Sequence, residues 1–290
     1  MANEFRTFAA KFYMMSECHG ACYISNGELV DCHGFDKVFL SHSTYIYEVF
    51  RVMWGIPLFL EDHLERLFQS VQLTGNSFPW TLSDLERQVM VLIETNSLKV
   101  GNLKFVFRQA GAGEKDILLL YVTEHKYPTQ QQFDEGVAVV LFDGIRSNPN
   151  AKVMDVVLRQ QTNEVKVSKH VYETLLVDAE GYITEGSRSN VFFIAGDAVI
   201  TPPLDYVLPG ITRKHIIECC RNMRLTVREE RVHMSRLKEF DAAFISGTSR
   251  RVLPLNQIDN HTFDARHKLI RQIQHDFNNK ITVYLLRAGL

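Results

Sequence analysis

The sequence lacks the features that mark most membrane, nucleic-acid-binding and disulfide-stabilised proteins. It has no apolar run near the roughly 20 residues that span a bilayer. Its 32 basic and 34 acidic residues give a net charge of −2 and form no block of one sign. We therefore expect neither a membrane nor a nucleic acid as a partner. The N-terminus has no basic segment followed by an apolar core, so it does not resemble a signal peptide, and we expect a cytoplasmic protein.

Cysteine is also scarce. Five cysteines in 290 residues, an odd number, argue against a disulfide framework. Cys18, Cys22 and Cys32 lie near His19 and His33, and these are residue types that bind zinc. Their spacings match no standard zinc motif, however, and the segment alternates like a hairpin. We expect reduced thiols here and no metal site.

The overall composition is ordinary for a soluble globular protein, with 46% hydrophobic and 23% charged residues. A chain of 290 residues is long for one domain. A polar segment that follows Pro128 separates two halves, in which strand and helix patterns alternate without a regular βαβ repeat. We predict an α+β fold with a small N-terminal domain at 1–127, a linker at 128–132 and a larger C-terminal domain at 133–290.

The N-terminal half contains one hairpin signal, two helix patterns and three further strand patterns. Asn26-Gly27 is the turn sequence that hairpins favour most. Leu64, Leu67 and Val71 recur at the three- and four-residue steps of an amphipathic helix, and Ser83 is the expected N-cap of a second helix. The remaining patterns predict strands at 44–55, 102–111 and 116–125, of which the last two pair.

Two short segments of the C-terminal half carry most of the functional information. Glu185 lies in ITEGSRSNVFF, where a polar turn leads into an apolar strand, and Leu208 begins LPGITR, which runs into a helical pattern. A glycine followed by a hydroxyl residue at a helix start exposes N–H groups and the positive end of the dipole, which bind phosphate. A phosphate site with a carboxylate nearby suits pyridoxal phosphate, whose ring nitrogen needs an acid to stay protonated.

These segments are similar to the signature of the class IV pyridoxal-phosphate aminotransferases. That family includes branched-chain aminotransferases, D-amino acid aminotransferases and aminodeoxychorismate lyases. The resemblance implies their two-domain fold, with pyridoxal 5'-phosphate in the cleft between the domains, and a homodimer. The matching positions are Glu185, Ser187, Asn190, Val191, Phe192, Val199, Thr201, Leu208, Gly210, Ile211 and Arg213.

The resemblance also implies a lysine that holds the cofactor as a Schiff base and then moves the substrate's α-proton. Lys152 fits this role because it follows a family-like run at 146–151 and precedes Glu185 by 33 residues. Lys166 and Lys169 are the alternatives, but they lie within a helical pattern. Glu185 is the residue expected to pair with the ring nitrogen. The run VMDVV at 153–157 departs from the family's usual Ser/Thr-x-Asn sequence.

The phosphate would be held by groups from three segments. The resemblance assigns it the backbone N–H groups of Ile211 and Thr212 and the turn that contains Gly247 and Thr248. It also assigns Arg66, whose planar guanidinium keeps its charge and suits an anion.

Three residues are candidates for substrate contact. Tyr47 and Arg51 lie four apart on a strand and so share a face, and they match positions that line the substrate pocket in relatives. Arg108 lies where D-amino acid aminotransferases begin a carboxylate trap, although the remainder of that trap is not visible. The family's Gly-Asp-Gly before the tyrosine is replaced by Ser-Thr-Tyr at residues 43–45.

We therefore expect an aminotransferase that exchanges an amino group between an amino acid and a 2-oxo acid, with branched-chain amino acids among the candidates. A lyase of the aminodeoxychorismate type shares every motif above and is the first alternative. A non-catalytic binding protein that keeps the fold is the second. Dependence on an amino acceptor separates the first two, and failure to bind the cofactor would indicate the third.

Overall fold

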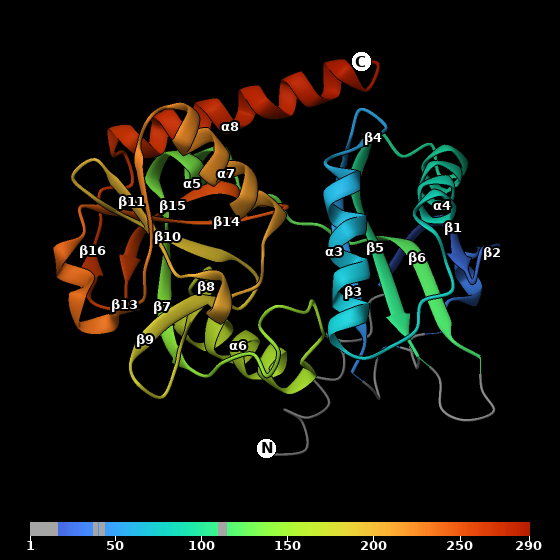
Figure 1. Ribbon diagram of the computed structural model, residues 1–290, viewed down its shortest axis with the longest axis horizontal. Coiled ribbons are helices and arrows are strands. Elements are labelled where there is room, and N and C mark those ends of the chain that lie inside the picture. The colour runs from blue at the N-terminus through green and yellow to red at the C-terminus, as the bar shows by residue number, and fades with distance from the viewer. Residues whose placement is uncertain (1–16, 37–39, 41–43, 110–114) are drawn as a thin grey trace.

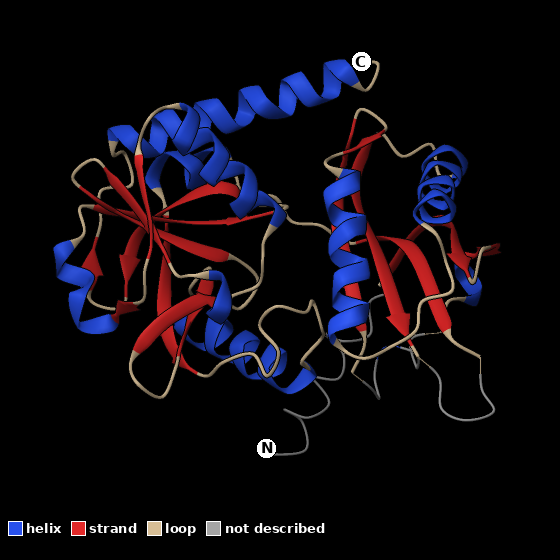
Figure 2. Cartoon of the chain, in the orientation of Figure 1, coloured by secondary structure: helices blue, strands red, loops and turns tan. Residues whose placement is uncertain are grey.

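The computed structural model describes residues 17–36, 40, 44–109 and 115–290. The N-terminal segment inspected for a signal peptide and residue 43 of the Ser-Thr-Tyr run lie outside the described residues. The described chain forms two β-sheets, one from each half of the sequence, and helices pack against both (Figures 1 and 2).

The first sheet is built from the N-terminal half, and its neighbouring strands are all antiparallel. Its strands, with a short 3-10 helix η1 (Cys32–Gly34), are β1 (Cys18–Ser25), β2 (Glu28–Asp31), β3 (Ile46–Met53), β4 (Ile56–Pro57), β5 (Val100–Arg108) and β6 (Ile117–Thr123). They lie in the order β2-β1-β6-β5-β3-β4. The predicted hairpin is confirmed: Asn26 and Gly27 join β1 to β2 with φ values of 50° and 89°, as a two-residue turn requires.

Helices α3 (Leu60–Leu73) and α4 (Leu82–Thr95) cover one face of this sheet. The predicted periodic residues Leu64, Leu67 and Val71 are buried there. The expectation that Ser83 caps the second helix is wrong. Thr81 is the N-cap, because its hydroxyl accepts from the Asp84 N–H at 3.2 Å and the Asp84 carboxylate accepts from the Thr81 N–H at 3.1 Å.

The second sheet has ten strands and comes from residues 137–262. Its order is β12-β11-β10-β14-β15-β7-β8-β9-β13, with β16 beside β15, and it is mixed because β7 runs parallel to both β8 and β15. Its strands are β7 (Val137–Asp143), β8 (Glu173–Val177), β9 (Tyr182–Gly186), β10 (Asn190–Ala195), β11 (Ala198–Thr201), β12 (Thr226–Glu229), β13 (Val232–His233), β14 (Ala242–Gly247), β15 (Arg251–Ile258) and β16 (His261–Thr262).

The helices of this half divide between two places. Apolar residues of α7 and α8 pack together on the second sheet, whereas α6 lies on its other side, toward the first sheet (Figure 1). The helical elements are α5 (Gln130–Glu135), α6 (Val156–Lys169), α7 (Ile211–Asn222) and α8 (Lys268–Arg287), with 3-10 helices η2 (Leu204–Tyr206) and η3 (Met234–Glu239). No helix in the part of the chain described here is long and apolar enough to cross a membrane.

The predicted linker at 128–132 falls between β6 and β7, the strands at which the chain leaves one sheet and enters the other. Its last three residues belong to α5. Thr129 starts that helix with a capping box, in which its hydroxyl accepts from the Gln132 N–H at 3.2 Å. The polar residues of the linker therefore form a helix start instead of an irregular segment.

Candidate active site

Lys152 lies in an extended segment that joins the two sheets. Its carbonyl accepts from the Tyr47 N–H of β3 at 3.0 Å, and its own N–H donates to Ser70 Oγ of α3 at 3.0 Å. Burial lowers the pKa of the Lys152 amine, and the guanidinium groups of Arg66 and Arg146 act in the same direction. A lowered pKa favours the neutral amine, which is the form that attacks a carbonyl or accepts a proton.

The atypical run after Lys152 has a local structural role. The Met154 N–H donates to the Tyr45 carbonyl at 2.8 Å, so this run pairs with the start of β3. Asp155 caps α6, since its carboxylate accepts from the Leu158 N–H at 2.9 Å. This segment therefore ties the start of α6 to the start of β3.

Glu185 is buried near the end of β9, with its two oxygens in different surroundings. Oε2 accepts from the Leu208 N–H at 3.2 Å, and Oε1 lies 2.7 Å from Arg146 Nε. That second contact is an ion pair with Arg146, and a carboxylate oxygen has a second lone pair that this contact does not use. Burial raises the pKa of Glu185, although the charges of Arg146 and Lys152 oppose the rise. Oε1 can therefore accept one further N–H.

Tyr47 lies between the lysine and α6. Arg159 of α6 donates from Nη2 to the Tyr47 hydroxyl at 3.1 Å, and the Lys152 Nζ lies 4.9 Å from the centre of its ring. Burial by itself would raise the pKa of Tyr47, but the positive charges of Lys152, Arg159, Arg146 and Lys104 outweigh it and lower the pKa to about 6. The surrounding cations thus favour the phenolate form of Tyr47.

The start of α7 is shaped for an anion. Gly210 is its N-cap and provides no side-chain acceptor, so the N–H groups of Ile211 and Thr212 lack the partner that a cap usually supplies. Asn190 holds the preceding loop by donating from Nδ2 to the Leu208 carbonyl at 2.9 Å. A Cβ at Gly210 would overlap the Asn190 amide oxygen, so the loop leaves no room for a side chain at this position.

Arg66 lies beside the same loop. It donates from Nε and Nη2 to Glu48 at 2.9 and 2.6 Å, and from Nη1 to the Pro209 carbonyl at 3.0 Å. Burial disfavours the charge on Glu48, but Arg66 and His63 outweigh it and hold the Glu48 pKa far below its usual range. The structure thus brings Arg66 to the start of α7, where the sequence predicted a phosphate.

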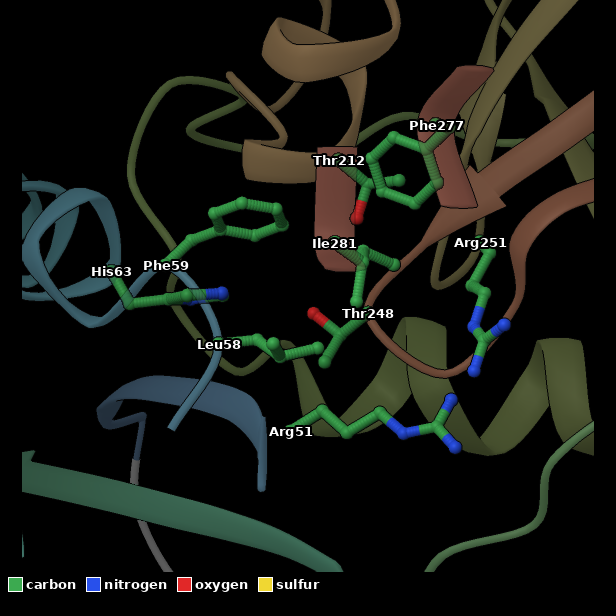
Figure 3. A pocket seen from close by; sticks show the side chains of 9 residues that line it. All are labelled: Arg51, Leu58, Phe59, His63, Thr212, Thr248, Arg251, Phe277 and Ile281. Atoms are coloured by element: carbon green, nitrogen blue, oxygen red, sulfur yellow. The ribbon is translucent and has the colours of Figure 1, made fainter. Parts of the chain in front are cut away.

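The predicted second phosphate turn meets the start of α7. Gly247 ends β14, and Thr248 follows it and donates from its hydroxyl to the Val49 carbonyl at 3.3 Å. Thr248 and Thr212 both line a partly open pocket (Figure 3). The other residues that line this pocket are Arg51, Leu58, Phe59, His63, Arg251, Phe277 and Ile281.

Arg51 and Arg108 lie apart from Lys152. Arg51 shares a face of β3 with Tyr47, but four residues of strand separate them by about 13 Å. Its guanidinium lies 3.7 Å from the centre of the Tyr127 ring, and it lines the pocket of Figure 3. Arg108 ends β5 opposite Ile117 and is half-buried. Residues 110–114, where a carboxylate trap would continue, lie outside the described residues.

Sequence reasoning missed three residues at this site. Arg146 belongs to the run before Lys152 but was not given a role, and Glu48 is adjacent to Tyr47. Arg159 follows Lys152 by seven residues on a helix, where an arginine is usually solvated. Only the packing of α6 against β3 shows that Arg159 contacts Tyr47.

The thiols form no comparable site. Cys18, Cys22 and Cys32 form no disulfide, and burial raises the pKa of the Cys18 thiol. Within the described ranges, no three histidine, cysteine, aspartate or glutamate side chains gather in a way that could hold a metal ion.

The arrangement fits pyridoxal phosphate. The buried Glu185 carboxylate, whose Oε1 retains a lone pair beside its ion pair with Arg146, suits a ring N–H. The open start of α7, with Arg66 beside it, suits the phosphate. The charge of Arg66 acts on the pKa of the Lys152 amine, and the charge of Lys152 acts on the pKa of Glu185, so these groups lie within electrostatic range of the lysine. These groups come from both halves of the chain.

Comparison with known proteins agrees with this geometry. The family model "Amino-transferase class IV" matches residues 45–258. A D-alanine aminotransferase of Bacillus licheniformis is 27% identical over 247 residues, which cover 81% of this chain and 87% of the relative. A probable branched-chain-amino-acid aminotransferase of Rickettsia bellii is 28% identical over 251 residues, covering 81% and 86%. A solved branched-chain amino acid aminotransferase from Escherichia coli matches with a TM-score of 0.81 and 21% identity, covering 92% of this chain and 96% of the other.

The fold and site thus define a pyridoxal-phosphate enzyme built from two sheets. Because the family model covers most of its length, the chain belongs to the class IV aminotransferases. The predicted family, the α+β two-domain fold, the aminotransferase class and the cofactor are confirmed.

Proposed function

We propose that this chain transfers an amino group between an amino acid and a 2-oxo acid, with Lys152 as the residue that anchors the cofactor and moves the proton. The observation that supports this most strongly is that Lys152, Arg146 and Glu185 form one buried electrostatic cluster, with Arg66 and the start of α7 beside it. The segments involved are far apart in the sequence.

Each of these residues has a distinct task in the proposal. Bound pyridoxal phosphate supplies an electron-withdrawing ring that stabilises the carbanion left when the α-proton is removed. The Lys152 amine, whose pKa burial lowers, would accept that proton from the α-carbon and return it to C4′ of the cofactor. Glu185 would keep a proton on the ring nitrogen through Oε1. Burial raises the pKa of Glu185, and a cation beside it, such as a protonated ring, lowers that pKa and favours the charged carboxylate.

The phosphate is assigned to Arg66, Ile211, Thr212, Gly247 and Thr248. Arg66 contributes charge and a planar donor set, the start of α7 contributes N–H groups, and the turn at 247–248 contributes a hydroxyl. Because Arg66 comes from the N-terminal half and α7 from the C-terminal half, a bound phosphate would also hold the two sheets together.

Of the predicted substrate residues, Tyr47 has the strongest support, since it lies next to the Lys152 amine. Arg51 and Arg108 remain predictions. One of the relatives is named as an aminotransferase of D-alanine and another as a probable aminotransferase of branched-chain amino acids. We infer that an amino acid of one of these two kinds supplies the amino group.

The remaining organisation is proposed from the resemblance. We propose a homodimer, two domains at 1–127 and 133–290 joined at 128–132, and a cytoplasmic location. Support for the domain boundary is that the chain passes from one sheet to the other between β6 and β7. Sedimentation velocity tests the dimer, and a single monomeric species at micromolar concentration would contradict it.

A half-reaction tests the function. The cofactor-loaded protein is mixed with a panel of L- and D-amino acids, without a 2-oxo acid, and the cofactor's visible absorbance is followed. An aminotransferase converts one equivalent and stops until a 2-oxo acid is added. A lyase of the aminodeoxychorismate type, given its own substrate, continues without an acceptor. Absence of conversion with every amino acid would contradict the proposed function.

A further inference from the structure

Three polar residues on one face of α3 contact the C-terminal half of the chain. Asp62, Arg66 and Ser70 are spaced four residues apart, so they follow one another along that face. Arg66 donates to the Pro209 carbonyl, and Ser70 Oγ accepts from the Lys152 N–H. Arg66 and Ser70 thus lie at the phosphate end and the lysine end of the proposed site, whereas Asp62 has no task there.

Asp62 connects α3 to α7. The two oxygens of its carboxylate lie 2.7 Å from His215 Nε2 and 2.5 Å from Lys214 Nζ. The hydrogen bond from His215, together with that from Lys214, outweighs burial and holds the pKa of Asp62 far below its usual range. Because both partners belong to α7, this one carboxylate ties the start of a helix from the N-terminal half to a helix from the C-terminal half.

The buried imidazole of His215 is held from several directions. Its Nδ1 lies 3.1 Å from Glu218 Oε2, which also accepts from Lys280 of α8 at 2.8 Å. A carboxylate oxygen thus lies at each ring nitrogen, and both hydrogen bonds form when both nitrogens carry a proton. The Phe59 ring packs on the imidazole with 4.0 Å between the ring centres, and Phe59 has a φ of 52° that bulky residues rarely adopt. These contacts fix His215 in place.

The contact between Asp62 and His215 lies one helical turn from the groups assigned to the phosphate. Asp62 precedes Arg66 by four residues on α3, and His215 follows Ile211 by four residues on α7, a rise of about 6 Å in each case. In the described part of the chain, Arg66 and Asp62 make the polar contacts from α3 to α7 and the loop before it. The spacing of the two helices at this end of the site therefore depends on Asp62.

We propose that Asp62 and His215 are positioning residues for the phosphate of the cofactor. Their contact sets the distance between the Arg66 guanidinium and the N–H groups at the start of α7, so that both can bind the same anion. The inference rests on the proposed function, which assigns the phosphate to these groups. A hydrogen bond between a carboxylate and an imidazolium is short and strong, and so suits the task of fixing a distance.

Simple electrostatics predicts the opposite effect of the carboxylate on the cofactor. Asp62 carries a negative charge near a site assigned to a phosphate, and like charges repel each other. Removal of the carboxylate would therefore strengthen phosphate binding if its charge were all that mattered, and weaken it if its contact with His215 positions the donors. The sign of the change in affinity distinguishes these two roles of Asp62.

Two ligands that differ by the phosphate alone test the inference without catalysis. The cofactor-free protein is titrated with pyridoxal phosphate and with pyridoxal, and the visible absorbance is followed. We expect Asp62→Ala and His215→Ala each to weaken pyridoxal phosphate by about tenfold, and to leave the affinity for pyridoxal nearly unchanged. Asp62→Asn should recover most of the lost affinity, because its amide oxygen still accepts from His215.

Two further variants serve as controls. Glu65→Ala removes an equal charge from an exposed position of the same helix, and should not weaken pyridoxal phosphate. The double variant Asp62→Ala/His215→Ala should bind pyridoxal phosphate no more weakly than the weaker of the two single variants, because each substitution removes the same contact. If the losses added in full, the two residues would act separately and the inference would be wrong.

The same titrations separate failure of this inference from failure of the proposed function. Unchanged or tighter binding of pyridoxal phosphate by Asp62→Ala, or equal weakening of pyridoxal, overturns the inference and leaves the phosphate site intact. Wild type that binds pyridoxal as tightly as pyridoxal phosphate overturns the assigned phosphate site itself. If Asp62→Ala fails to fold, Asp62→Glu decides the matter: it keeps the charge but moves the carboxylate, so pyridoxal phosphate should bind more weakly, and unchanged affinity overturns the inference.

Discussion

The amino group of Lys152 lies 4.9 Å from the centre of the Tyr47 ring, and the backbone N–H of Tyr47 donates to the Lys152 carbonyl at 3.0 Å. The two residues come from different halves of the chain, yet both backbone and side chain link them. Because the lysine segment pairs with the start of β3, its backbone holds the amine in place relative to the tyrosine ring.

Tyr47 should ionise at an unusually low pH in the cofactor-free protein. The positive charges of Lys152 and Arg159 lower its pKa to about 6, so the phenolate should form as the pH rises through about 6 instead of near 10. Ultraviolet difference absorbance follows tyrosinate directly. The step near pH 6 should disappear in Tyr47→Phe and move upward in Arg159→Gln. A wild-type titration with no tyrosinate below pH 9 would contradict the predicted charge environment.

Glu185→Gln should bind the cofactor and lose most of its activity. Glutamine keeps the shape of the side chain but supplies no negative charge to hold a proton on the ring nitrogen. We expect kcat of the half-reaction to fall by roughly 10²–10³-fold, the range for loss of one preorganised electrostatic group. Glu164→Gln, an exposed change on α6, is the matched control. Activity of Glu185→Gln within about threefold of wild type would exclude the assigned role.

The role of Arg66 in phosphate binding is tested by a substitution that also removes the charge of its partner Glu48. Arg66→Ala alone would leave the buried Glu48 without its guanidinium and destabilise the fold by about 3–5 kcal/mol. The double variant Glu48→Gln/Arg66→Met removes both charges. It should bind pyridoxal phosphate roughly 10–100-fold more weakly, as expected for losing a charge-assisted hydrogen bond.

Pyridoxal, which has no phosphate, supplies the control for this variant. Its affinity should be the same in wild type and in the double variant, because Arg66 acts on the phosphate alone. Equal weakening of pyridoxal and pyridoxal phosphate, measured by absorbance titration, would mean that Arg66 supports the fold and does not contact the phosphate.

Gly210→Ala should weaken cofactor binding because it displaces the neighbouring residue Asn190. The added methyl group would overlap the Asn190 amide oxygen and displace the loop that starts α7. Gly34→Ala, where a Cβ has open space, should have no effect. Shortening the obstructing residue in Asn190→Ala/Gly210→Ala should recover part of the affinity lost by Gly210→Ala. No recovery would show that the loss has another cause.

Local patterns predicted much of the fold. The hairpin at Asn26-Gly27, the periodic face of α3 and the pairing of β5 with β6 depend on residues close together in the sequence, and all three are present. The order of the ten-stranded sheet was not predictable in the same way. The parallel pairing of β7 with β15 joins residues more than a hundred positions apart, so no local signal marks it.

The residues of the site likewise fall into those that a local sequence pattern predicts and those that depend on long-range packing. Lys152 and Glu185 were found because they lie in or near a signature with fixed spacing. The contact of Arg159 with Tyr47 depends on how α6 packs against β3, and the contact of Arg146 with Glu185 depends on how the loop after β7 folds back. An arginine in a sequence gives no indication of whether it faces solvent or a buried tyrosine.

The central claim is that Lys152 carries the cofactor. The most direct test is the visible absorbance of the purified protein before and after borohydride reduction, followed by mass mapping of the modified peptide. We predict a yellow chromophore that reduction fixes to Lys152, with no label on Lys166 or Lys169. A colourless protein that stays colourless with added pyridoxal phosphate, or a label on another lysine, would contradict the account.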